Sequence, residues 1–294
     1  MVLDQEKESF VTRAVRLAVI LLSFVSVAAP ALAQSRPLAT EDPETVPAGN
    51  ILFEAGFDVS RSAVFPVSGL TGTFTRIGTF GFSFGISSIA EIQLDGGLRN
   101  RLSIATRDPN APLASMLEVP ADTTSDVEDG RIGAKVRFAS ETASRPAMAV
   151  RFSTKLPNAG NESGLGLDTT DFHFGFALGK TVRSVRTVAN LGFAILPDPV
   201  RGDRQNDVLE FGLSVARAVR PGVEFVGELN GRKNTRSGQT ITGTESRGVV
   251  RVGTRATRGP VRVDGALMLG ITEFDPSWGI SAGLTWVFKV FDVP

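Results

Sequence analysis

An alternation of apolar and polar residues with a period of two constrains this chain most, and it runs from about residue 51 almost to the C-terminus. In the first such segment, Phe53 and Phe57 fall on one face, whereas Glu54 and Asp58 fall on the other. Successive side chains of a β-strand point to opposite faces, so this period predicts strands and not helices. No run of about 18 apolar residues is present, which excludes a protein that crosses a membrane as helices.

The alternation recurs in about twelve segments, each close to the roughly ten residues that a tilted membrane strand needs. The chain is therefore predicted to be all-β. The predicted strands are residues 51–60, 73–86, 89–105, 130–139, 147–157, 170–181, 186–196, 207–219, 222–233, 244–256, 260–271 and 278–289.

The connections between these segments alternate between long polar stretches and short turns. The long ones are residues 61–71, 106–129, 158–169, 197–206, 233–243 and 272–277. Outer-membrane barrels have long loops outside the cell and short turns in the periplasm. We therefore predict an antiparallel transmembrane β-barrel of about 12 strands over residues 51–290, in the bacterial outer membrane. A secreted soluble sandwich or lipocalin-like barrel is the alternative, but the Phe-rich apolar face suits lipid better.

Residues 1–33 have the pattern of a secretory signal peptide. Arg13 and Arg16 precede an apolar run over residues 17–29, and Ala31-Leu32-Ala33 gives the small-x-small cleavage pattern. The run is too short to span a bilayer as a helix. We therefore expect a cleaved precursor, with residues 34–50 as a short periplasmic segment before the barrel.

Composition excludes several classes of site. Lys and Arg together number 31, as do Asp and Glu, so no basic excess is available for nucleic acid. The chain has no cysteine and one histidine, which excludes disulfides, thiolate zinc sites and a multi-histidine metal site. We expect no cofactor and no bound metal. The partners expected are outer-membrane lipid, the barrel-assembly machinery during biogenesis, and a small-molecule solute.

Several segments resemble a known family. They are residues 37–47 with the strand that follows, the stretch DGRIGAKVRF from Asp129, the stretch GLGLDTTDF from Gly164, and the stretch WGISAGLTW from Trp278. Together they resemble the transporter family linked to the meta-pathway of phenol degradation, over most of residues 37–290. The resemblance implies an outer-membrane barrel and a role in uptake of hydrophobic or aromatic compounds. Related fatty-acid channels have an N-terminal plug, and residues 34–50 are expected to be too short for one.

Charged residues on the polar face are the candidate functional set. Neighbouring strands lie about 4.8 Å apart, so inward charges of opposite sign can form ion pairs. These charges either select ions and polar solutes or form salt bridges that fill the lumen, and the sequence favours neither. Inward glycines, including Gly175, Gly212 and Gly283, favour a narrow channel. The predicted pore-lining residues are Glu54, Asp58, Glu91, Asp95, Arg131, Lys135, Arg137, Arg151, Lys155, Asp171, His173, Glu210, Glu224, Glu228, Arg247, Arg251, Arg255, Arg262 and Asp264.

No constellation for catalysis stands out. His173 lies two residues from Asp171 on the same strand face, as in a catalytic pair, but the sequence places no serine beside it. The acidic stretch from Asp122 to Asp129 lacks the spacing of a calcium loop and is interpreted as a solvated surface loop. We therefore predict a non-enzymatic channel for passive passage of small solutes. The alternatives are a plugged structural or adhesive barrel with partner-binding loops and, less favoured, a barrel lipid hydrolase.

Overall fold

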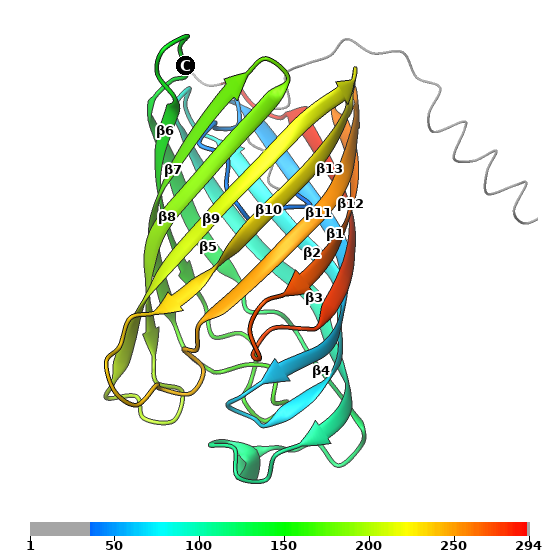
Figure 1. Cartoon of the computed structure of the whole chain (residues 1–294), viewed down its shortest axis with the longest axis vertical. Coiled ribbons are helices and arrows are strands. Elements are labelled where there is room, and N and C mark those ends of the chain that lie inside the picture. Colours follow the sequence, from blue (N-terminus) through cyan, green and yellow to red (C-terminus); the bar gives the residue numbers. More distant parts are fainter. Residues whose placement is uncertain (1–35, 293–294) are drawn as a thin grey trace, which may run out of the picture.

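Twelve long antiparallel strands close into a barrel in the computed structural model, which describes residues 36–292 (Figure 1). Strand β1 pairs with β2 on one side and with β13 on the other, and β2 also pairs with β3, so the ring is complete. The prediction of about twelve strands is confirmed. The predicted signal peptide lies outside the described residues. The barrel strands are β1 (Asn50–Phe65), β2 (Leu70–Gly85), β3 (Ala90–Arg107), β5 (Arg131–Ala139), β6 (Ala147–Lys155), β7 (Asp171–Val182), β8 (Val185–Pro197), β9 (Gln205–Arg220), β10 (Val223–Asn234), β11 (Arg247–Arg258), β12 (Val261–Gly270) and β13 (Trp278–Lys289).

The apolar face of these strands points outward and does not form a core. In water such a surface would be costly, whereas the acyl chains of a bilayer solvate it. No helix within residues 36–292 is long and apolar enough to cross a membrane. The exposed apolar side chains on the strands include Phe57, Ile77, Leu94, Ile132, Phe152, Phe172, Phe176, Leu191, Phe193, Leu213, Phe225, Val252, Val263, Leu267, Ile280 and Trp286.

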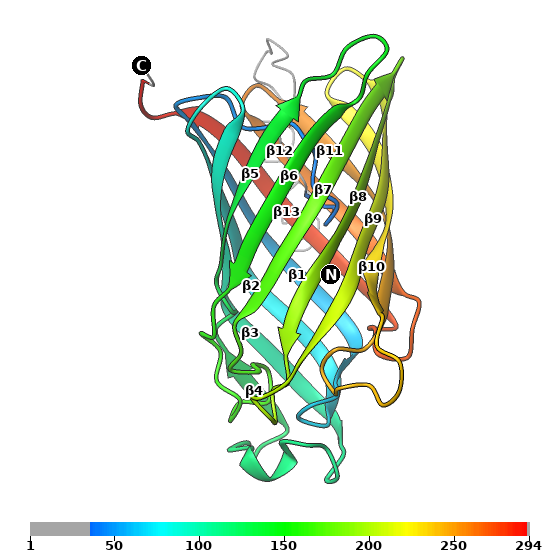
Figure 2. The ribbon, with the colours of Figure 1, turned by 90° about the vertical axis from the view of Figure 1, so that its left-hand side faces the viewer.

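The two ends of the barrel differ (Figures 1 and 2). At one end the connections are short turns, such as residues 183–184 and 221–222. At the other end lie long loops, and the longest connection, between β3 and β5, contains the one-turn helix η1 (Ala114–Met116) and strand β4 (Thr123–Asp126). Within the described residues, strand β4 pairs with β3 alone, at positions 100–103, so it extends the wall beyond the barrel.

One predicted loop is wrong. Residues 61–71 were expected to form a long loop. Instead β1 continues to Phe65 and β2 begins at Leu70, so a four-residue turn joins them. The turn closes through a hydrogen bond from the amide N–H of Gly69 to the carbonyl oxygen of Phe65, at 2.8 Å. Gly69 has φ +74°, a left-handed conformation that glycine adopts without steric cost.

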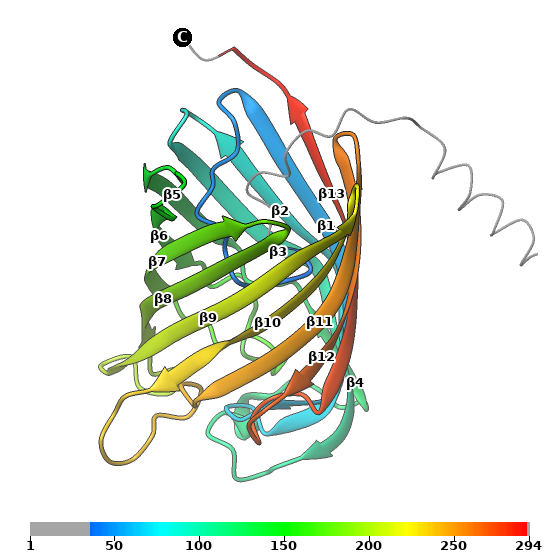
Figure 3. The same cartoon turned by 45° about the horizontal axis from the view of Figure 1, so that its top comes forward.

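Residues 36–49, which we name the strap, lie inside the barrel, entering from the end with the short turns (Figure 3). The carboxylate of Glu228 on β10 accepts hydrogen bonds from the N–H groups of Ala39 and Thr40, at 2.8–3.0 Å. Asn190 on β8 exchanges two hydrogen bonds with the backbone of Glu41. Residues 34–50 were expected to form a short periplasmic segment, too short for a plug. The described part of it, residues 36–49, lies in the lumen instead, because an extended chain needs no fold of its own when the wall satisfies its backbone.

Inward glycines make room for the strap. A β-carbon at Gly212 would lie 2.8 Å from the hydroxyl of Thr40, and one at Gly179 would lie 2.7 Å from the ring of Pro43. At Gly56 and Gly283 it would overlap the guanidinium group of Arg36. Gly179, Gly212 and Gly283 were expected to leave space for a narrow channel, but the strap occupies that space. Gly175 differs, because a β-carbon there would meet no atom closer than a backbone oxygen of β8 at 3.5 Å.

The strap position predicts a disulfide. A β-carbon at Gly212 would lie 3.5 Å from that of Thr40, at the short edge of the range that a disulfide requires. Because the chain has no cysteine, the double variant Thr40→Cys/Gly212→Cys should form one intramolecular disulfide on oxidation. Mass spectrometry after alkylation measures it. The control is Thr40→Cys/Gly175→Cys, which should remain reduced; equal oxidation of both variants would contradict the strap position.

Candidate functional site

The lumen wall pairs charges across neighbouring strands. Glu91 on β3 and Lys135 on β5 are opposite each other in the register, and their side chains form an ion pair of 3.0 Å. Both side chains are fully buried. Arg151 on β6 lies 3.8 Å from Asp95, and the guanidinium of Arg151 donates to Gln93. These predicted residues therefore form one network on the wall made by β3, β5 and β6.

A second group of predicted residues lies on β10, β11 and β12. Arg251 pairs with Glu228 at 2.6 Å, and Arg255 pairs with Glu224 at 2.7 Å. Arg262, which is almost fully buried, lies 3.7 Å from the same carboxylate of Glu224. As expected from the register, the first two pairs join directly opposite positions of β10 and β11. A charge excluded from water is stable only when paired in this way.

The remaining predicted basic residues differ in whether a carboxylate pairs with them. Lys155 bridges Asp129 and Asp171, at 3.0 and 3.4 Å. Arg247 lies near the loop end and donates to two backbone carbonyl oxygens and to no carboxylate within the described residues. The guanidinium group of Arg131 has neither a hydrogen bond nor an ion pair within residues 36–292. Among the predicted cations in the described residues, Arg131 and Arg247 thus lack a carboxylate partner.

Sequence reasoning predicted Glu54 and Asp264 on the wall but missed Arg36 and Asp42 of the strap, which bind the wall. The carboxylate of Glu54 on β1 accepts a hydrogen bond from the backbone N–H of Arg36. The guanidinium group of Arg36 lies 3.7 Å from the carboxylate of the buried Asp264 on β12. Asp42 forms a two-point ion pair with Arg186 of β8, at 2.6 and 3.0 Å. No period of two runs through the strap, so alternation could not place Arg36 and Asp42 inside. Arg186 does lie on an alternating strand, and its position was open to prediction.

Arg76 on β2 was also missed. Its guanidinium group pairs with the predicted residue Asp58 at 3.1 Å and with Glu128 of the loop before β5. Glu128 and Asp129 were interpreted as part of a solvated surface loop. They are instead bound by Arg76 and Lys155, because the loop folds back over the lumen.

Two cavities remain in the lumen beside the strap. One, of about 280 Å³, is lined by residues of the strap and of β5 to β10. The other, of about 510 Å³, is lined by the strap, by β1, β2, β3, β5 and β6 and by the loops above them. Ala39, Glu41, Arg131 and Arg151 line both cavities, so the strap and the two arginines stand between them.

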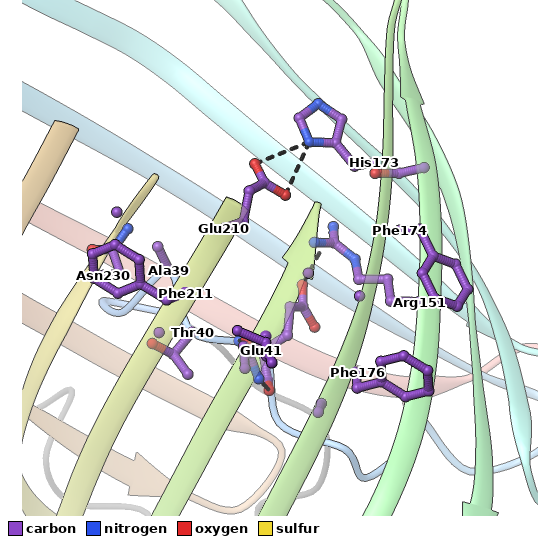
Figure 4. Close-up of a pocket in the computed structure, with 18 of the residues that line it drawn as sticks. Ala39, Thr40, Glu41, Arg151, His173, Phe174, Phe176, Glu210, Phe211 and Asn230 are labelled. Atoms are coloured by element: carbon purple, nitrogen blue, oxygen red, sulfur yellow. Dashed lines mark hydrogen bonds and ion pairs between the residues drawn. The ribbon is translucent and has the colours of Figure 1, made fainter. Parts of the chain in front are cut away.

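His173 faces the smaller cavity, and its partner is not Asp171 (Figure 4). Its Nδ1 lies 3.1 and 3.2 Å from the two carboxylate oxygens of Glu210 on β9. Ser153 on β6 is directly opposite His173 in the register. The Oγ of Ser153 and the Nε2 of His173 are both buried, and neither has a hydrogen-bond partner within residues 36–292. The sequence could not place this serine, because 15 residues of loop, positions 156–170, separate β6 from β7.

No protein-family model matches the chain, and no curated protein matches its sequence. Among solved structures, the chain is similar to a COG4313 outer membrane channel from Pseudomonas putida F1, with a TM-score of 0.60 at 12% identity, covering 89% of this chain and all of that one. Lower similarity is found to the NanC porin, with 9% identity over 82% of this chain and all of that one and a TM-score of 0.48. The toluene transporter TodX of Pseudomonas putida has 12% identity over 83% of this chain and 90% of that one, with a TM-score of 0.41.

The similarity to the first of these structures shows the fold, an outer-membrane β-barrel of twelve strands. With its apolar exterior, this fold places the protein in the bacterial outer membrane, in contact with lipid. The family linked to the meta-pathway of phenol degradation is not matched, so that finer resemblance stays an expectation.

The buried pair on the wall makes a prediction about stability. Lys135→Met leaves the carboxylate of Glu91 buried and without its cation, which should cost about 3–5 kcal/mol in the free energy of unfolding. The double variant Glu91→Gln/Lys135→Met should recover at least half of that loss. Urea unfolding in lipid vesicles measures both. Lys289→Met, at a side chain 66% exposed, is the control and should change stability by less than about 0.5 kcal/mol. Equal effects at both lysines would contradict the pairing.

Proposed function

We propose that the protein is a channel through which small solutes diffuse passively across the outer membrane. The observation that carries this proposal is the lumen itself. Two cavities of about 280 and 510 Å³ remain on either side of a strap that is held only by hydrogen bonds, ion pairs and packing. A barrel of this strand number lies between eight-stranded barrels filled by side chains and open sixteen-stranded porins.

The inner wall favours polar solutes. Charged and amide side chains such as Arg131, Arg151 and Asn190 line the smaller cavity, and a solute there would exchange water for these groups. The lipid-facing side carries the large apolar residues. The hydrophobic or aromatic compounds implied by the family resemblance are therefore the less favoured class of solute for this lumen.

Conductance tests the proposal. Gly175 faces the smaller cavity and has room for a side chain, so Gly175→Phe should at least halve the single-channel conductance of refolded protein in a planar bilayer. Gly227 is on the opposite face of its strand from Glu228, so Gly227→Phe should leave conductance unchanged. Absence of conductance at every voltage would contradict the channel and favour a plugged structural or adhesive barrel.

A barrel hydrolase is the second candidate, favoured by one observation. Ser153, His173 and Glu210 have the residue types and order of a nucleophile, a base and an orienting carboxylate, and they share a cavity. Arg131 lines the same cavity as a cation without a partner among the described residues. No hydrogen bond joins Ser153 to His173, which makes hydrolysis the weaker candidate.

A fluorophosphonate probe separates the two candidates. A channel without hydrolase activity should leave Ser153 unlabelled, as measured by peptide mass spectrometry of the folded protein. A hydrolase should be labelled at Ser153, and labelling should be lost in His173→Ala. Labelling of a hydrolase should also be lost in Ser153→Ala and kept in the matched control Ser214→Ala, because Ser214 is an equally buried serine on β9. Labelling of Ser153 that depends on His173 would contradict the non-enzymatic assignment.

A further inference from the structure

Four basic side chains of the wall point at the strap and together form what we name the basic ladder: Lys135, Arg137, Arg151 and Arg186. They come from β5, β6 and β8, which are neighbours in the barrel together with β7. In a lumen with equal numbers of fixed acids and bases on the wall, such a ladder would be neutralised by the wall. Here much of its neutralisation comes from the strap.

Three acids close together in the strap bind the ladder. Glu41 lies 3.4 Å from the ammonium of Lys135 and 3.5 Å from the guanidinium of Arg151. Asp42 takes the two-point pair with Arg186 described above. Glu44 pairs with Arg137, and within residues 36–292 this is the only carboxylate that Arg137 meets within 4.0 Å.

The wall supplies only part of the counter-charge. Glu91 pairs with Lys135, Glu141 pairs with Arg186, and Asp95 lies at a long 3.8 Å from Arg151. If the strap moved away, Arg137 would have no carboxylate within 4.0 Å, and the nearby Arg131 already has none within the described residues. The wall around the ladder therefore has a surplus of positive charge, which the carboxylates of the strap neutralise.

The contacts are of a kind that a free solute can reproduce. A guanidinium group binds the two oxygens of a carboxylate or phosphate in a planar fork, and it does not distinguish a side chain from a small molecule. Of the four ladder residues, Arg151 lines both cavities, next to Glu41 of the strap, so a solute can approach the ladder at Arg151. The ends of the strap stay anchored by Arg36 at β1 and β13 and by Val46 at Glu91.

We propose that the basic ladder is a binding site for a small organic anion with two or more carboxylate or phosphate groups, and that Glu41, Asp42 and Glu44 of the strap occupy this site as an internal substitute ligand. The inference deepens the proposed channel function and rests on it, because it names the class of solute. A solute of this class competes with the strap carboxylates, whereas a neutral solute does not.

Citrate binding to the full-length folded protein in detergent, measured by isothermal titration, tests the site. Two triple variants lose the same three negative charges: the neutral-strap variant is Glu41→Gln/Asp42→Asn/Glu44→Gln, and its control is Glu118→Gln/Asp122→Asn/Glu273→Gln, all at loop positions outside the lumen network. The neutral-strap variant should bind citrate at least tenfold more tightly than the control. Equal affinities in the two variants would overturn the proposal.

Two further measurements protect the test against misfolding and non-specific charge effects. Adding Arg137→Gln/Arg186→Gln to the neutral-strap variant should return citrate affinity to that of the control, and unchanged affinity would overturn the site. In the Thr40→Cys/Gly212→Cys protein, the oxidised form should bind citrate at least tenfold more weakly than the reduced form of the same sample. Equal binding by the two forms would show that the strap does not compete.

A second probe, pyrophosphate, distinguishes the anion class: tighter binding than citrate assigns phosphate-bearing solutes, and weaker binding assigns carboxylates. Titration requires no conduction, so the site and the channel are tested separately. A barrel that conducts but does not bind either anion contradicts the site alone. A barrel that binds citrate but does not conduct contradicts the channel alone.

Discussion

Lipid offers no hydrogen bonds, and this constraint determines the rest of the structure. A strand with unpaired N–H and C=O groups cannot face the bilayer, so the sheet must close, and β1 meets both β2 and β13. Closure separates two environments along every strand. The outward positions must be apolar and the inward positions become polar. Inward charges that are buried must find partners. The ion pairs of Lys135 and Arg262 follow from closure, as does the small size of the apolar clusters inside the described part of the chain.

The fold was predictable from the sequence because one local pattern, repeated about twelve times, determines both the strands and their faces. The inward direction of Glu91, Lys135 and Arg251 follows from alternation, and their pairing follows from the register of neighbouring strands. The turn at residues 66–69 was not predictable in this way, because polar residues near a strand end resemble a loop whether or not they remain paired.

The site was less predictable, for two physical reasons. The strap has no alternation, and three acids close together are typical of a solvent-exposed segment, so nothing local indicated that the wall would bind them. The opposition of Ser153 and His173 depends on register across a long loop, which local patterns do not determine. The inward glycines were the one sequence feature that indicated a segment inside the lumen. Each was interpreted as empty space, whereas the space at Gly179, Gly212 and Gly283 is filled by the strap.

The position of Arg36 has a consequence for how the closed barrel is held together. Its backbone N–H binds Glu54 on the first strand, and its guanidinium donates to the carbonyl oxygen of Ala282 on the last strand. These two strands form the seam that closes the cylinder. Contacts on both sides of the seam from within join the first and last strands in addition to their backbone pairing. A residue that precedes the barrel strands thus acts as a brace across the seam, and its loss should loosen the closure of the cylinder.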